Sequence, residues 1–168
     1  MSDYNAALLL LRLAFGLMMI AHGYGKIFLG GKLDGTAGWF DSMGMKPGAV
    51  HARLAAGAEI ATGVGLAIGF LTTFSAMGFV ALMVVAGYTV HRKNGFFIVS
   101  EGWEYVFTIA VAAVAIAMLG PGEWSVDAAA NFDHIFDSWV GLIIAGGGGV
   151  AAGIGQLALF YRPPAEAV

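Results

Sequence analysis

Three observations in the sequence predict an all-α polytopic membrane protein. Of its 168 residues, 59% are hydrophobic and only 11% are charged, whereas an ordinary soluble domain carries roughly a quarter charged residues. So few polar side chains cannot cover a surface that faces water. The apolar residues also gather in long runs, and a transmembrane helix needs about 20 of them. We therefore expect one integral membrane domain over residues 1–168.

Turn-forming sequences divide the apolar residues into five predicted spans. The spans are expected at about 6–28, 49–71, 74–91, 103–119 and 138–161. The second follows KPG, TT makes the turn into the third, RKNGFF precedes the fourth, GPG ends the fourth, and RPP ends the fifth. Proline suits the first turn of a helix and stops a helix elsewhere, so these boundaries have a physical basis.

Two connecting loops have structure of their own. In the first loop, Thr36 is expected to cap a short interfacial helix that places Trp39, Phe40 and Met43 on one side, with the aromatic rings against lipid. A loop folded over the bundle is an equal alternative. The acidic stretch GPGEWSVDAAANFDHIFDSW leaves room for another short surface helix.

The basic residues predict the orientation of the bundle. Five spans place the first loop, the third loop and the C-terminus on one side, and that side holds seven of the eight Lys and Arg residues. The positive-inside rule then puts the N-terminus outside and the C-terminus in the cytoplasm. The first residues lack a basic n-region and a cleavage site, so they are interpreted as a span and not as a removable signal.

Composition also limits the chemistry. The chain has no cysteine, which excludes disulfides and thiolate metal sites. The net charge is −3 and no basic patch is present, so a nucleic-acid partner is not expected.

Small residues recur every four positions in two spans. They are Gly65 and Gly69 in the second span and Gly141, Ala145, Gly149 and Gly153 in the fifth. This spacing lets helix backbones approach closely, so we interpret these positions as helix-packing residues. A phosphate-binding loop is a poor alternative, because no Lys-Ser/Thr pair accompanies the glycines.

Glu59 is the most unusual residue of the spans. It lies about ten residues into the second span, roughly 15 Å from the helix start. An ionisable group at that depth is costly and is a hypothesis of a functional site by default. A bare carboxylate there is either protonated or paired with a cation.

Other ionisable residues lie at span ends on the same side of the membrane, and we expect nothing comparable at the outer ends. We predict a polar pocket open toward the cytoplasmic leaflet, with candidate residues Arg12, His22, Lys26, Glu59, His91, Glu104 and Tyr105. On the first span, Arg12, His22 and Lys26 fall within an arc of about 120°. Snorkelling to the headgroups is the alternative for His22 and Lys26, and structural ion pairing is the alternative for the whole cluster.

Five segments in a fixed order carry a family resemblance. They are LLLLRLAFGLMMIAHGYGKIF, GTAGWFDSMGMKPG, LAAGAEIATGVGLAIGFLT, HRKNGFF and EGWEYVF. Over about residues 6–125, the chain resembles the DoxX family of small bacterial membrane proteins. The resemblance implies a four-helix transmembrane bundle of DoxX type in the bacterial inner membrane. The span at about 138–161 would then be an additional, fifth transmembrane helix.

The resemblance also implies a class of function. The family is named through its relation to DoxD, a subunit of an archaeal thiosulfate:quinone oxidoreductase, and members have been linked with membrane-associated oxidative-stress complexes. In a quinone-linked redox subunit, His22 or His91 would hydrogen-bond a quinone carbonyl, Glu59 or Glu104 would relay a proton, and Lys26 would stabilise a reduced anion. The sequence has no haem, flavin or iron–sulfur motif, so a partner would supply the electrons.

The sequence leaves two readings open and disfavours two more. A non-catalytic accessory subunit would dock its fifth span onto another membrane protein or a second copy, and its polar cluster would stabilise the bundle or hold a lipid headgroup. Transport is disfavoured because 168 residues carry no inverted repeat. Imidazole and carboxylate could bind a metal, but the Glu-x-x-His spacing of carboxylate-bridged sites is absent, so no metal is predicted. Whether the protein is an enzyme stays open.

Overall fold

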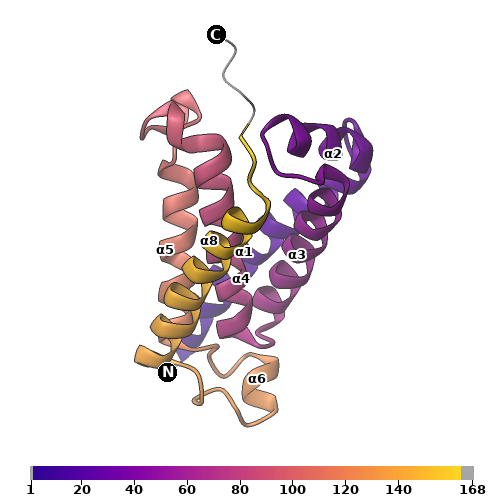
Figure 1. The fold of residues 1–168 in the computed structure, drawn as a ribbon. Coiled ribbons are helices and arrows are strands. Elements are labelled where there is room, and N and C mark those ends of the chain that lie inside the picture. The colour runs from indigo at the N-terminus through magenta and orange to yellow at the C-terminus, as the bar shows by residue number, and fades with distance from the viewer. Residues whose placement is uncertain (1, 164–168) are drawn as a thin grey trace.

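A computed structural model describes residues 2–163, which form a helical bundle without a β-strand. The α-helices are α1 (Ser2–Phe28), α2 (Lys32–Ser42), α3 (Gly48–Ile68), α4 (Thr72–Ala86), α5 (Glu104–Leu119), α6 (Val126–Ala129), α7 (Ser138–Gly141) and α8 (Gly149–Phe160). Short π- or 3₁₀-helical segments are η1 (Gly87–His91), η2 (Arg92–Asn94), η3 (Ile98–Ser100) and η4 (Leu142–Gly148). Figure 1 shows α2 at one end of the bundle and α6 at the other.

Three helical segments are long and apolar enough to cross a membrane: Asp3–Phe28, Thr72–Asn94 and Ser138–Phe160. The second joins α4 to η1 and η2, and the third joins α7, η4 and α8. Helix α3 has 21 residues but carries Arg53 and Glu59, and α5 is a shorter apolar helix of 16 residues. The all-α membrane fold is therefore confirmed, while the number of spans remains a prediction.

Helix α2 differs from the expected interfacial helix in its start and in the direction it faces. It begins at Lys32, so Thr36 lies inside it and its hydroxyl donates to the Lys32 carbonyl at 2.9 Å instead of capping the helix. Phe40 is buried and packs with Met45 and Val85. The prediction that the aromatic side lies against lipid is therefore wrong for Phe40, because α2 folds over the end of the bundle.

Close glycine contacts join α1 to α3. A Cβ atom at Gly16 would lie 2.6 Å from the carbonyl oxygen of Gly63, and one at Gly63 would lie 2.7 Å from that of Gly16. Nearer the other end, a Cβ at Gly23 would lie 2.8 Å from the Ala56 carbonyl oxygen. Only glycine fits at these distances, so the two backbones run in direct contact.

The glycines predicted as a packing pair on α3 have different roles. Gly65 lies against the α4 side chain of Ser75 and the carbonyl of Phe70, at the turn into α4. Gly69 lies beyond the end of α3 as its C-cap, with a φ of 68° that favours glycine. Gly69 therefore ends α3 and also lies against the Arg12 side chain of α1, where a Cβ atom would not fit.

The small residues of the fifth predicted span pack inside the chain. Ala145 is fully buried. A Cβ at Gly149 would lie 2.6 Å from Cβ of Val80, and one at Gly153 would lie 2.7 Å from Cβ of Val84. Gly141 lies against the α5 backbone at Ala117. The ladder therefore packs on α4 and α5, so it is not available to dock a second protein.

Candidate functional site

A partly buried ion pair links α1 to α3 near the α2 end of the bundle. The Lys26 ammonium lies 2.7 Å from each carboxylate oxygen of Glu59, and the Glu59 residue is only 8% exposed. The close helix approach at Gly23, one turn before Lys26, brings the two side chains within reach. Lys26 thus satisfies the buried carboxylate and does not extend to the surface.

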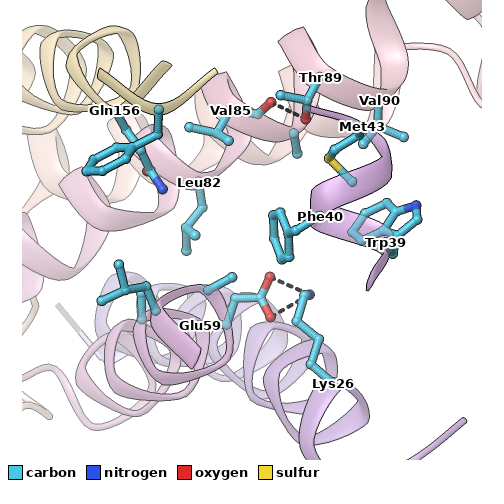
Figure 2. Close-up of a pocket in the computed structure, with 15 residues that line it drawn as sticks. Lys26, Trp39, Phe40, Met43, Glu59, Leu82, Val85, Thr89, Val90 and Gln156 are labelled. Carbon is cyan, nitrogen blue, oxygen red and sulfur yellow. Dashed lines mark hydrogen bonds and ion pairs between the residues drawn. The ribbon is translucent and has the colours of Figure 1, made fainter. Parts of the chain in front are cut away.

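A cavity of about 340 Å³ lies beside this ion pair, between α2, α3, α4 and α8. Figure 2 shows Glu59 and Lys26 on one side of it and Val85, Thr89 and Gln156 on the other. Most of its remaining wall is apolar, and Phe40 of α2 lies between the two sides. The cavity therefore offers an apolar space with charged groups at one wall.

A second cavity of about 270 Å³ adjoins the same ion pair, between α1, α4 and α5. His22, His91 and Tyr105 line it, together with Lys26 and Glu59. The structure thus brings five of the seven predicted pocket residues to one cavity. Because Lys26 and Glu59 line both cavities, the ion pair lies where the two meet.

His22, His91 and Tyr105 of the second cavity differ in the hydrogen bonds that they make. Nδ1 of His91 lies 2.7 Å from the Glu101 carbonyl oxygen. Because a carbonyl accepts, Nδ1 carries the proton and Nε2 of the neutral ring is left as an acceptor. The Tyr105 hydroxyl donates to the sulfur of Met18 at 2.8 Å, and His22 has no hydrogen bond within residues 2–163.

The π-helical turn η1 shapes one wall shared by these cavities. Thr89 and Val90 of this turn line the first cavity, and Val90 and His91 line the second. A π-turn inserts an extra residue into a helix and shifts the direction of its side chains, and such turns are frequent at functional sites.

Glu104 and Arg12 lie apart from this site. A Glu104 carboxylate oxygen accepts a hydrogen bond from the Ile98 backbone amide at 2.9 Å, which holds the loop before α5. Arg12 precedes Lys26 by fourteen residues, or about 21 Å along α1. It shares the face of Lys26 but lies toward the opposite end of the bundle.

Arg12 belongs to a second buried polar cluster, so the expectation that nothing comparable gathers at the outer ends is wrong. Arg12 is 0% exposed and donates to the Trp124 carbonyl. The nearby Asp127 carboxylate stabilises this charge and accepts hydrogen bonds from the Leu71 and Thr72 amides, at 2.7 and 2.9 Å, and from the Thr72 hydroxyl. Asp127 thereby caps α4 from α6, more than fifty residues away in the sequence.

Two polar residues at the first cavity's edge were not among the predicted pocket residues. His51 is buried between the rings of Phe40 and Phe160, and its Nδ1 lies 3.3 Å from Nε2 of Gln156. Gln156 also lines the cavity. It stands in a glycine-rich apolar run, and the one available signal was an amide side chain inside a predicted span.

The donor set does not suggest a metal centre. Within residues 2–163, no three His, Asp or Glu side chains are arranged to hold a metal ion. The buried carboxylates bind an ammonium group or backbone amides instead.

These features define a class of protein: a helical membrane protein with an ion pair between two cavities. The sequence profile of the DoxX family matches residues 7–92, about half of the chain, so the protein belongs to the DoxX family. An uncharacterized protein of Haemophilus influenzae is 27% identical over 94 residues, which cover 56% of this chain and 62% of that protein. The chain thus matches less than two thirds of that relative's length. No solved structure matches this sequence.

The family match contains both partners of the ion pair. Residues 7–92 include Lys26, Glu59 and His91, whereas Tyr105 and Gln156 lie beyond it. The match also ends before the segment EGWEYVF, so it is shorter than the resemblance expected over about residues 6–125.

Proposed function

We propose that this DoxX protein binds a quinone-type ligand at the Lys26–Glu59 ion pair and serves as the membrane subunit of a redox complex. The observation that carries the proposal is the position of this pair at the junction of two largely apolar cavities. A structural ion pair needs no space beside it, whereas an amphipathic ligand needs an apolar slot with a few convergent polar groups.

The residues present suit the polar end of such a ligand. The Lys26 ammonium and the Tyr105 hydroxyl would donate to carbonyl oxygens, Nε2 of His91 would accept from a hydroxyl, and Glu59 would hold or release a proton. A bound quinone would supply reversible two-electron chemistry, which the side chains of this chain do not provide. The first cavity, about 340 Å³, is at the lower end of the range of about 300–1,000 Å³ for ligand pockets.

The rim of the first cavity favours entry from the bilayer. Leu54 of α3 is 54% exposed and Phe160 of α8 is 36% exposed, and both line the cavity. The opening therefore lies on the flank of the bundle between these helices, where acyl chains surround the protein. An apolar ligand dissolved in the membrane could enter there without crossing water.

The remaining parts of the proposal follow from the sequence. The chain has no cysteine and no cofactor motif, so a partner protein would pass electrons to or from the ligand. The basic residues around the α2 end favour a position of this end, and with it the pocket, at the cytoplasmic face of a bacterial inner membrane.

Extraction of the purified protein tests the proposal. We expect protein purified from membranes in mild detergent to retain quinone, measured by chromatography of an organic extract, at close to one molecule per chain. Glu59→Gln and His22→Ala should each lower this amount about tenfold. Glu123→Gln, an exposed acid at the opposite end, is the matched control and should retain it.

The alternative function gives a different outcome. Wild-type protein that carries no quinone, but purifies in a stoichiometric complex with a larger protein by native mass spectrometry, would contradict the proposal. That result would favour a non-catalytic accessory subunit.

A further inference from the structure

A larger groove runs along another side of α4, between α5 and the η4–α8 helix. Its volume is about 730 Å³, and nearly all of its lining side chains are apolar. Met83 and Val106 line both this groove and the second internal cavity, so they form the wall between the two. In Figure 1, α4, α5 and α8 lie next to one another along the bundle. The groove is thus separate from the ion-pair site.

A cation lies at one end of the groove. The Arg92 guanidinium carbon lies 3.8 Å from the centre of the Tyr88 ring, and both residues line the groove. In the described part of the chain, Arg92 makes no hydrogen bond or ion pair. A cation–π contact leaves the N–H edges of a guanidinium free. Glu101 and Glu104 lie in the following segment, but neither lines the groove.

The length of the groove corresponds to one leaflet of a bilayer. It extends along the Thr72–Asn94 helical segment from Val80 to Arg92, twelve residues or about 18 Å. Half of the hydrocarbon core of a bilayer is about 15 Å thick. With Arg92 and Trp103 at the interface, the apolar end of the groove therefore reaches the middle of the membrane.

We propose that this groove is a binding site for an anionic phospholipid, with an acyl chain along α4 and the headgroup phosphate on Arg92. A guanidinium binds phosphate through paired hydrogen bonds, and its Tyr88 contact fixes the plane of the group. Tyr88 and Trp103 line the groove with Arg92, and tyrosine and tryptophan rings are favoured at the headgroup level of membrane proteins. The rest of the groove offers an acyl chain only apolar contacts.

Native mass spectrometry with matched lipids tests this site. Protein in detergent would be mixed with equal amounts of phosphatidylglycerol and phosphatidylcholine that carry identical acyl chains. We expect one retained lipid, with phosphatidylglycerol favoured about fivefold, the factor that corresponds to about 1 kcal/mol for a basic residue near a membrane surface. Arg92→Gln should abolish the preference, whereas Arg53→Gln, an exposed arginine on α3, should keep it.

Filling the groove tests the acyl-chain part of the proposal. Val111 is half exposed and lines the groove, so Val111→Trp should remove both lipids. Val64→Trp, at an exposed position on α3 outside the groove, should leave them bound. If Val111→Trp does not fold, Val150→Trp fills the groove from the α8 side.

Three results would overturn the proposal. One is an equal loss of preference in Arg53→Gln and Arg92→Gln, because attraction would then be spread over the whole basic end. Another is full lipid retention in both folded tryptophan variants of the groove. The third is displacement of the lipid by millimolar inorganic phosphate, which would indicate an anion site without an acyl-chain groove.

Discussion

Arg12 and Lys26 are cations on the same face of α1, and each has a buried acid nearby, but their surroundings differ. Around Arg12 the side chains fill the space: the residue is 0% exposed, and the cavity beside Asp127 is only about 10 Å³, close to the limit for one water. Around Lys26 and Glu59, the two cavities measure about 340 and 270 Å³.

The difference assigns a different role to each buried charge. Asp127 accepts hydrogen bonds from the Leu71 and Thr72 amides at the start of α4, so it holds α6 against the bundle. Glu59 has Lys26 as its hydrogen-bond partner and borders empty space. The adjacent cavities are therefore what distinguishes the Lys26–Glu59 pair, and they are the reason for proposing a ligand there.

The largest expected effect is on the polar cluster of Arg12 and Asp127. Asp127→Ala should lower the free energy of unfolding by about 3–5 kcal/mol, because it leaves the Leu71 and Thr72 amides without their acceptor and removes the carboxylate that stabilises the buried Arg12 charge. The measurement is thermal or SDS-induced unfolding in detergent, followed by circular dichroism. Glu123→Ala, an exposed acid of the same loop, should change stability by no more than about 0.5 kcal/mol. If Asp127→Ala unfolds at the same midpoint as the wild type, the result would contradict a structural role for this cluster.

The next effect concerns the contact that sets the distance between α1 and α3. Gly63→Ala should destabilise the protein by about 1–3 kcal/mol, because its Cβ would lie 2.7 Å from the Gly16 carbonyl oxygen. Gly57→Ala is the matched control on the same helix: no atom lies within 4 Å of its new Cβ, so it should be neutral or stabilising. Equal unfolding midpoints for the two variants would contradict the close packing.

The Lys26–Glu59 ion pair should contribute less to stability than the cluster of Arg12 and Asp127. Glu59→Gln is expected to cost about 1–2 kcal/mol, because the side chain of Lys26 is 20% exposed and can turn its ammonium toward the headgroups. The same variant should lose most of its bound ligand. An unfolding curve shifted as far as that of Asp127→Ala would mean that both ends are structural.

The smallest effect is expected at the cavity wall supplied by α8. Gln156→Leu removes the hydrogen-bond partner of the His51 Nδ1 atom and should cost about 1 kcal/mol. Because Gln156 lines the first cavity, ligand affinity should change in the same variant. Unchanged stability and affinity would show that α8 only covers the bundle. Gln156→Asn, which keeps the amide but shortens its reach, separates the loss of polarity from the loss of contact.

More of the fold than of the candidate site could be predicted from the sequence, for physical reasons. Long apolar runs and prolines mark helices directly, so the predicted span at 74–91 and the α4–η1 segment end at the same residue. Helical phase also placed Arg12 and Lys26 on one face, but phase says nothing about which neighbour fills that face. Asp127 lies on α6, a helix of only four residues that is too short to show a periodicity, so its contact with α4 could not be deduced. Which glycines make close helix contacts depends on the partner helix. The contact between Gly16 and Gly63 could therefore not be deduced from either helix alone.

Because α8 is synthesised after the other helices, the packing of Gly149 and Gly153 on α4 also determines when the cavity is completed. These glycines seat the last helix against Val80 and Val84, while Gln156 and Phe160 of the same helix complete the cavity wall. Until this helix leaves the ribosome and docks, the wall of the cavity is unfinished and α4 is open on that side. Completion of the cavity wall is therefore a late event, and a ribosome that stops after α5 would release a bundle with an incomplete cavity.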